Sequence, residues 1–77
     1  MQIKVLGPGC VKCRMLEKNT EEALKELGID AEVEHVTDFK EITNYGVFAT
    51  PGLVVNGKVK LAGKLASKEE IKKLLSA

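Results

Sequence analysis

The chain has 77 residues, of which 44% are hydrophobic and 30% are charged, and its formal net charge is +1. This length and balance predict one small globular domain, residues 1–77, and exclude a disordered or low-complexity chain. Only 4% of the residues are aromatic and Lys and Arg form no dense stripe, so the chain lacks the stacking and charge pattern of a nucleic-acid-binding protein.

Membrane insertion and secretion are not expected either. The longest stretch without a charged residue, 42–57, contains Pro51 and three glycines, which is not the pattern of a membrane span. The first residues lack the basic and apolar regions of a secretory signal. We therefore expect a cytoplasmic protein, and a structural disulfide is rare in that compartment.

The first half of the chain predicts a strand, a turn and a long helix. Residues 2–6 are rich in β-forming side chains, and Gly7-Pro8-Gly9 is a turn sequence. From residue 11 to residue 27 the apolar groups recur at helical spacing, and Gly28 is a typical helix stop. The expected buried face of this helix consists of Cys13, Leu16, Ala23, Leu24 and Leu27.

The second half predicts two further helices and three further strands. Residues 31–36 alternate roughly as a strand, with Ala31, Val33 and His35 on one side. Asp38 and Glu41 then resemble a capping box, which predicts a short helix with Phe39, Ile42 and Tyr45 on its apolar side and Gly46 at its end.

A hairpin and a final helix complete the expected order. Residues 53–55 and 58–61 flank Asn56-Gly57, a strong signal for a tight hairpin turn. Ser67 and Glu70 form a second capping box, followed by a helix that buries Ile71, Leu74 and Leu75. The predicted order is β-α-β-α-β-β-α, with the first two strands parallel.

Chemistry is expected at Cys10 and Cys13, the only two cysteines of the chain. They lie three residues apart where the first strand gives way to the first helix, and residues i and i+3 of a helix are close enough for a disulfide. A lone Cys-x-x-Cys in a cytoplasmic protein indicates redox chemistry or metal binding. The helix N-terminus favours a thiolate at Cys10. Lys12 is a candidate for lowering the pKa of Cys10 further, and its alternative is a solvated lysine on an exposed first turn. We expect Cys10 to be the nucleophile and Cys13 the resolving thiol.

The element order, the Cys-x-x-Cys at the start of the first helix and Thr50-Pro51 before the third strand resemble the thioredoxin fold. The stretch from Gly7 to Cys13 and the segment 50–57 are most similar to the small thioredoxin-like and glutaredoxin-like redox-active disulfide proteins. The resemblance implies an α/β fold with three helices and a four-stranded mixed sheet in the order 2-1-3-4. It also implies that the first and third helices cover one face and the second helix the other.

The same resemblance implies a protein-disulfide oxidoreductase with no bound cofactor, whose redox group is the Cys10–Cys13 disulfide. Pro51 would be cis and face the cysteines, which leaves the backbone of Thr50 free to pair with an extended substrate. Gly9 would leave room for that substrate. The expected partners are proteins with disulfides and an electron donor, either a thioredoxin-reductase-like enzyme or glutathione, and we expect a monomer.

The sequence also departs from the families it resembles. It has no tryptophan before Cys10, no Gly-Pro between the cysteines and no acidic residue before Glu17. The proton acceptor for Cys13 is therefore unassigned. His35 is expected to be a surface or partly packed strand residue, and Tyr45 a packing residue at the end of a helix, with the rim of a substrate groove as its alternative.

The alternative function is a soft-metal carrier. Two thiolates at this spacing can hold Cu(I), as in heavy-metal-associated domains of similar length. Those domains usually have methionine where this chain has Pro8, and their element order leaves no place for the helix expected from residue 38 or for the terminal helix. A structural zinc site would need four ligands, and only Cys10, Cys13 and the distant His35 are soft donors.

Overall fold

The computed structural model describes residues 1–76 as four strands and three helices in the expected order. The elements are β1 (Gln2–Leu6), α1 (Val11–Leu27), β2 (Glu32–Val36), α2 (Phe39–Asn44), β3 (Gly52–Val55), β4 (Lys58–Ala62) and α3 (Lys68–Ser76). None of the described helices is long and apolar enough to cross a membrane.

The four strands form one mixed sheet in the order β2-β1-β3-β4, which confirms the predicted topology. β1 pairs in parallel with β2 and antiparallel with β3, so that Leu6 lies opposite Val36 on one side and Gly52 on the other. The end of β1 therefore lies beside the start of β3. β3 and β4 form the predicted hairpin, whose turn residues Asn56 and Gly57 both have positive φ, at 51° and 82°.

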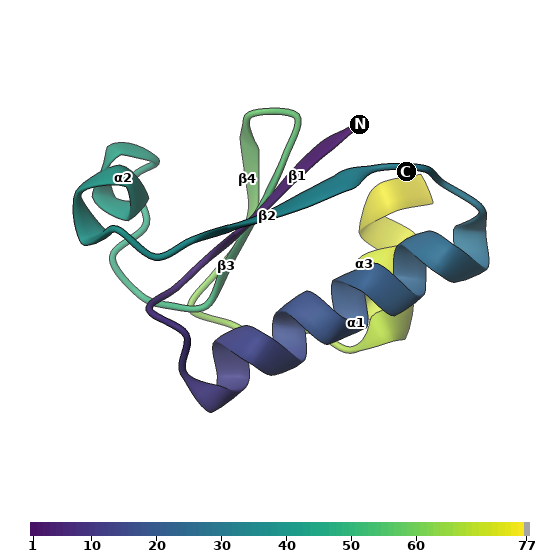
Figure 1. The fold of residues 1–77 in the computed structure, drawn as a ribbon, viewed down its shortest axis with the longest axis horizontal. Helices are drawn as coiled ribbons and strands as arrows, with labels where there is room; N and C mark the ends of the chain where they lie inside the picture. Colours follow the sequence, from purple (N-terminus) through teal and green to yellow (C-terminus); the bar gives the residue numbers. More distant parts are fainter. Residues whose placement is uncertain (77) are drawn as a thin grey trace.

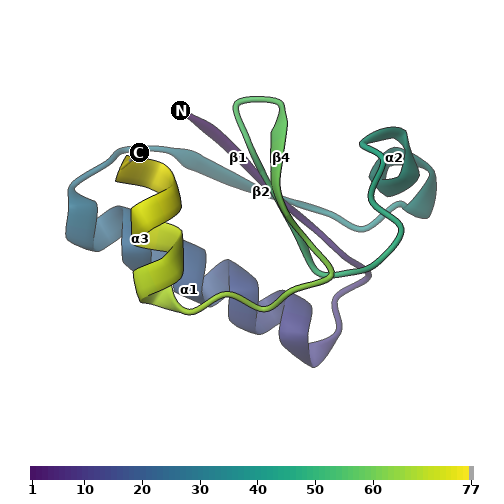
Figure 2. The ribbon, with the colours of Figure 1, turned by 180° about the vertical axis from the view of Figure 1, so that it is seen from behind.

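Helices cover both faces of the sheet because successive strand residues point to opposite sides. Ile3 and Val5 of β1 belong to a buried cluster with Leu16 of α1 and Ile71 of α3. On the opposite face, Leu6 packs with a smaller buried cluster that lies under α2; its other members are Val36, Ile42, Val47 and Val54. Figures 1 and 2 show α1 and α3 side by side below the sheet and α2 at one end of the other face.

The helix ends follow the capping signals of the sequence. Cys10 is the N-cap of α1, and Gly28 caps its C-terminus in the left-handed region at φ 69°. Asp38 accepts a hydrogen bond from the backbone N–H of Lys40 at the start of α2. Ser67 accepts one from the N–H of Glu70, which confirms the capping of α3.

Some packing predictions need correction. Phe39 was expected on the apolar side of α2, but its side chain is 62% exposed, because a helix of six residues turns only Ile42 and the following Tyr45 toward the sheet. Leu27 and Leu74 are half-buried. Thr20, which was not expected in the core, is fully buried and donates its hydroxyl to the Leu16 carbonyl at 2.7 Å.

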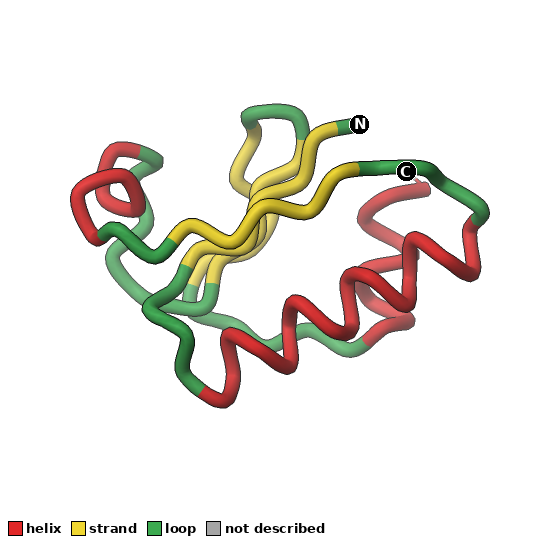
Figure 3. Tube along the Cα trace, in the orientation of Figure 1, coloured by secondary structure: helices red, strands yellow, loops and turns green. Residues whose placement is uncertain are grey.

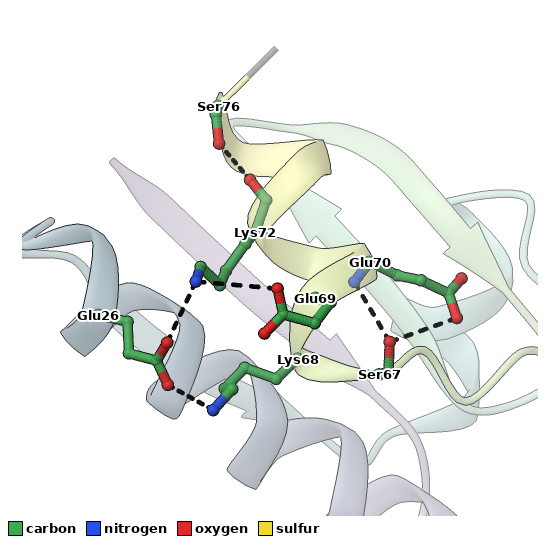
Figure 4. A network of polar contacts seen from close by, with 7 residues as sticks. All are labelled: Glu26, Ser67, Lys68, Glu69, Glu70, Lys72 and Ser76. Atoms are coloured by element: carbon green, nitrogen blue, oxygen red, sulfur yellow. Dashed lines mark hydrogen bonds and ion pairs between the residues drawn. The ribbon is translucent and has the colours of Figure 1, made fainter.

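An ion-pair network joins the outer surfaces of α1 and α3 (Figure 4). The Glu26 carboxylate of α1 accepts from Lys68 at 2.5 Å and from Lys72 at 3.1 Å. Lys72 also lies 3.9 Å from Glu69. The hydrogen bonds from Lys68 and then Lys72 hold the pKa of Glu26 below its ordinary value. Such exposed pairs contribute little to stability and are screened by salt.

We expect Glu26→Gln to lower the urea midpoint slightly at low salt and not at all at high salt. The pKa of Glu26 is lower in the folded chain than in the unfolded one, so this contribution is present above the ordinary value of 4.5 and is lost as the pH falls below it. Urea unfolding monitored by circular dichroism at two salt concentrations measures the effect. Glu21→Gln on the same helix is the control, and an equal loss in both variants would contradict the assignment.

Candidate active site

The two cysteines lie at the end of the sheet where β1 stops and β3 begins. The turn from Gly7 to Cys10 and the loop that precedes β3 lie at this same end (Figure 3). Parallel and antiparallel pairing of β1 with its neighbours brings these segments together, because Leu6 lies opposite Gly52. The site is thus assembled from parts of the chain that are far apart in sequence.

Cys10 is exposed and sits at the N-terminus of α1. Its Sγ accepts a hydrogen bond from the backbone N–H of Cys13 at 3.3 Å, in the way that a serine or aspartate caps a helix. The Sγ atoms of Cys10 and Cys13 are 2.6 Å apart, and one thiol can donate to the other sulfur. The Cys13 thiol, followed by the backbone N–H groups of Cys13 and Lys12, lowers the pKa of Cys10 from its ordinary value.

Cys13 is fully buried in the first turn of α1. Burial raises the pKa of the Cys13 thiol, and its hydrogen bond to Cys10 raises it further. The charged form of a thiol is costly in an apolar environment, whereas the thiolate of Cys10 is stabilised by donors. The pKa values of the two neighbouring thiols are therefore shifted in opposite directions: Cys10 ionises more readily, and Cys13 keeps its proton.

The pKa difference predicts how the reduced protein reacts with an alkylating agent. Cys10 should reach half its maximal rate at a pH below 9.0, because donors favour its thiolate. In Cys13→Ala this midpoint should rise toward 9.0, since the thiol donor is lost while the backbone donors stay. Iodoacetamide labelling followed by mass spectrometry at a series of pH values measures both. An unchanged midpoint in Cys13→Ala would contradict the hydrogen bond's role.

Gly7 is part of the site for a reason that the sequence did not reveal. It was expected to shape the turn before Cys10, but it is not among the glycines with positive φ. It is buried, and a Cβ at this position would overlap the Sγ of Cys13. The same Cβ would lie 3.7 Å from the Cβ of Thr50. Gly7 therefore allows the buried sulfur to lie directly against the backbone, between the helix and the loop before β3.

The Thr50–Pro51 peptide bond is cis, and Pro51 is buried. The Pro51 carbonyl accepts a hydrogen bond from Gly63 at 2.9 Å, which fixes the loop to the segment after β4. Within residues 1–76, neither backbone group of Thr50 has a hydrogen-bond partner. Thr50 is half-buried beside Gly7, and its unpaired backbone groups lie on the Gly7 side of the site, where Cys13 also packs.

The remaining predicted site residues have different positions. Gly9 has φ 92° and open space where a side chain would be. Lys12 is exposed, and its backbone N–H is the group of this residue that lowers the pKa of Cys10. Tyr45 is half-buried, and its hydroxyl accepts from Lys4 at 3.0 Å. Tyr45 thus packs α2 against β1, in agreement with its expected packing role.

His35 contacts two groups near the cysteines. Its Nε2 lies 3.1 Å from the carbonyl oxygen of Gly7, and its Nδ1 lies 3.1 Å from the carboxylate of Glu17. The residue is partly packed on β2, as expected, but these contacts were not foreseen. In the described part of the chain, no three His, Cys, Asp or Glu side chains are grouped as a metal site would require.

Comparison with known proteins agrees with this geometry. Residues 1–76 match the model of the thioredoxin domain family. The chain is 55% identical over 76 residues to a protein named thioredoxin from Methanothermobacter thermautotrophicus, with 99% of each chain covered. It is 44% identical over 75 residues to a thioredoxin from Methanocaldococcus jannaschii, with 97% of this chain and 86% of the relative covered. The chain therefore belongs to the thioredoxin domain family, and it is a thiol-disulfide oxidoreductase whose redox-active group is the Cys10–Cys13 pair.

Proposed function

We propose that the protein reduces disulfides in partner proteins, with Cys10 as the attacking thiol and Cys13 as the resolving thiol. The observation that carries this assignment is the contrast between the two sulfurs. Cys10 is exposed and its pKa is lowered, whereas Cys13 is buried and its pKa is raised. Only the first can meet the disulfide of a folded partner.

The reaction has two exchanges. The Cys10 thiolate attacks one sulfur of the substrate disulfide, which forms a mixed disulfide and releases the other substrate sulfur as a thiolate that takes up a proton. Cys13 then loses its proton and attacks the Sγ of Cys10, which closes the Cys10–Cys13 disulfide and releases the second substrate thiol. The two cysteine sulfurs give two electrons to the substrate; of the two protons it gains, one balances the proton lost by Cys13, and the other comes from solvent because Cys10 starts as a thiolate.

The backbone of Thr50 is proposed to pair with an extended segment of the substrate. Its unpaired groups lie beside the cysteines, and addition of a strand to free backbone is a general mode of peptide recognition. Pro51 is fixed next to Thr50 by the hydrogen bond from Gly63, and the open space at Gly9 leaves room for the approaching segment. Val11 and Phe48, which are 65% and 85% exposed, offer apolar contact near these residues in the sequence.

Lys12 is proposed to favour the Cys10 thiolate through its positive charge, in addition to its backbone N–H. The side chain is exposed on the first turn of α1, where a thiolate at the N-cap is two residues away. Solvent screens this contribution, so Lys12→Gln should alter the alkylation midpoint of Cys10 less than Cys13→Ala does.

The electron donor is proposed to be an NADPH-linked thioredoxin reductase. This choice rests on the family membership and on relatives that are themselves named thioredoxin. Both reactive sulfurs come from one chain, so a monomer is sufficient for the cycle.

The test supplies the oxidised protein with such a reductase or, separately, with glutathione, and follows thiol appearance and the reduction of insulin disulfides. We expect NADPH oxidation that depends on the protein and on both cysteines. Reduction by glutathione alone would replace the proposed donor, and no insulin reduction from the fully reduced protein would contradict the proposed substrate class. Cys10→Ser and Cys13→Ser are the matched controls.

A further inference from the structure

The His35 ring joins three elements behind the active site. It lies on β2, its Nε2 contacts the Gly7 carbonyl just beyond the end of β1, and its Nδ1 contacts Glu17 of α1. Both distances are 3.1 Å. The side chains of His35 and Glu17 are 25% and 31% exposed, so water only partly reaches the pair.

Both nitrogens of the His35 ring face acceptor groups. A backbone carbonyl oxygen and an ionised carboxylate are both acceptors. The Gly7 carbonyl oxygen can only accept, so the contact at Nε2 is a hydrogen bond when Nε2 carries the hydrogen. With Nε2 directed at the Gly7 backbone and Nδ1 beside Glu17 of α1, the ring has a single orientation.

Both backbone groups of Gly7 contact β2. Its N–H donates to the Val36 carbonyl at 2.9 Å, and its carbonyl accepts from His35. In a parallel ladder the Gly7 carbonyl would next accept from a backbone N–H of the segment that follows β2, and no such bond is made among residues 1–76. The His35 side chain takes the place of the next rung of the ladder.

The position of Gly7 matters because Cys13 rests on it. A Cβ at Gly7 would overlap the Sγ of Cys13, so the buried sulfur has no space to spare on this side. The attack of Cys13 on Cys10 requires its sulfur to be aligned with the mixed disulfide. Misplacement by about 1 Å can slow a reaction by up to about 100-fold.

We propose that His35, oriented by Glu17, is a positioning residue for the second exchange: it holds the Gly7 carbonyl and thereby keeps Cys13 aligned with Cys10. The inference rests on the proposed roles of the two cysteines and adds a residue to them. His35 does not touch the reacting sulfurs, and the first exchange, at the exposed Cys10, does not depend on it.

Two substitutions separate the contacts of the ring. The amide nitrogen of glutamine reaches about as far as Nε2, so His35→Gln can still donate to Gly7. The amide nitrogen of asparagine reaches about as far as Nδ1, so His35→Asn can still donate to Glu17 but not to Gly7. Glu34→Gln, also on β2 but paired with Lys4 at 3.6 Å, is the matched control.

The two exchanges are measured in one experiment with the reduced protein and an aromatic disulfide whose released thiolate is coloured. The first colour release reports the attack of Cys10, and the second reports the attack of Cys13 on the mixed disulfide. We expect His35→Asn to slow the second release by about tenfold with the first unchanged. His35→Gln should restore the second rate, and Glu34→Gln should alter neither.

Each other outcome is informative. Equal second rates in wild type and His35→Asn, or equally slow second rates in His35→Asn and His35→Gln, would overturn the role of the Gly7 contact. A similar slowing of both releases would show general weakening of the fold and would also overturn it. Failure of wild type to give two releases would instead contradict the proposed roles of the cysteines.

Discussion

Cys13→Ser should accumulate a stable mixed disulfide between Cys10 and a partner protein, whereas the wild-type protein should release the partner. The serine hydroxyl cannot attack the mixed disulfide, so the reaction stops after the first exchange. The effect is expected to be nearly complete. The Sγ of Cys13 lies 2.6 Å from that of Cys10, and residues 1–76 contain no third cysteine that could attack the mixed disulfide in its place. Non-reducing electrophoresis and mass spectrometry with oxidised insulin measure it.

Cys10→Ser is the matched control for this trap. It retains Cys13, which is buried and whose pKa is raised by that burial, and so should form little mixed disulfide. If both variants accumulated the mixed disulfide equally, or if only Cys10→Ser did so, the proposed roles of the two cysteines would be contradicted. The comparison tests the consequence of burial directly, since the two side chains are otherwise the same group.

Gly7→Ala should impair both stability and the second exchange. Its added methyl group would overlap the Sγ of Cys13, and neither the backbone of β1 nor the first turn of α1 can move without disturbing the core. Overpacking of this kind typically costs about 1–3 kcal/mol. We expect a lower urea midpoint, together with slower closure of the Cys10–Cys13 disulfide.

Pro8→Ala is the control for this prediction. Pro8 is the exposed neighbour of Gly7 and lies in the same turn. Its substitution should have a much smaller effect on both measurements. If Gly7→Ala were as stable as Pro8→Ala and closed its disulfide at the same rate, the close packing of Cys13 on Gly7 would be contradicted.

Most of the fold could be predicted from local signals. Helical or alternating spacing of apolar residues located α1 and β2, and β-forming side chains located β1. Capping and turn signals located the other elements and marked helix ends, among them Gly28, Asn56-Gly57 and Ser67. The boundaries differ by one residue at β2, β3 and β4, where sheet pairing rather than side-chain type decides the ends. The resemblance supplied the strand order, which local patterns leave open.

The residues that surround the two cysteines were harder to predict, because their contacts depend on how the strands pair and how α1 packs. The sequence suggests that Gly7 is a turn residue. The structure shows instead that Gly7 must lack a side chain because Cys13 packs against it. His35 and Gly7 are separated by 28 positions and meet because β1 and β2 pair in one particular register. Glu17, whose carboxylate contacts His35, was noted in the sequence only as the first acidic residue after the cysteines.

Phe39 was expected to be buried and is exposed. Its spacing from Ile42 favoured a buried position, but α2 is too short to bury a wide face against the end of the sheet. Thr20 was missed for a different reason. Its hydroxyl is satisfied within α1 by the Leu16 carbonyl, so a residue that looks polar in the sequence can occupy the core.

Cys10 and Cys13 are expected to form one reversible dithiol–disulfide couple. The most direct measurement is a redox titration of the wild-type protein in thiol–disulfide buffers, with the oxidation state read by alkylation and mass spectrometry. We predict a single two-electron transition between one dithiol and one intramolecular disulfide, at a potential within the range of about −270 to −120 mV spanned by related oxidoreductases. Stable Cu(I) binding by the two thiols with no reversible disulfide anywhere in the titration would contradict the account and favour a metal carrier.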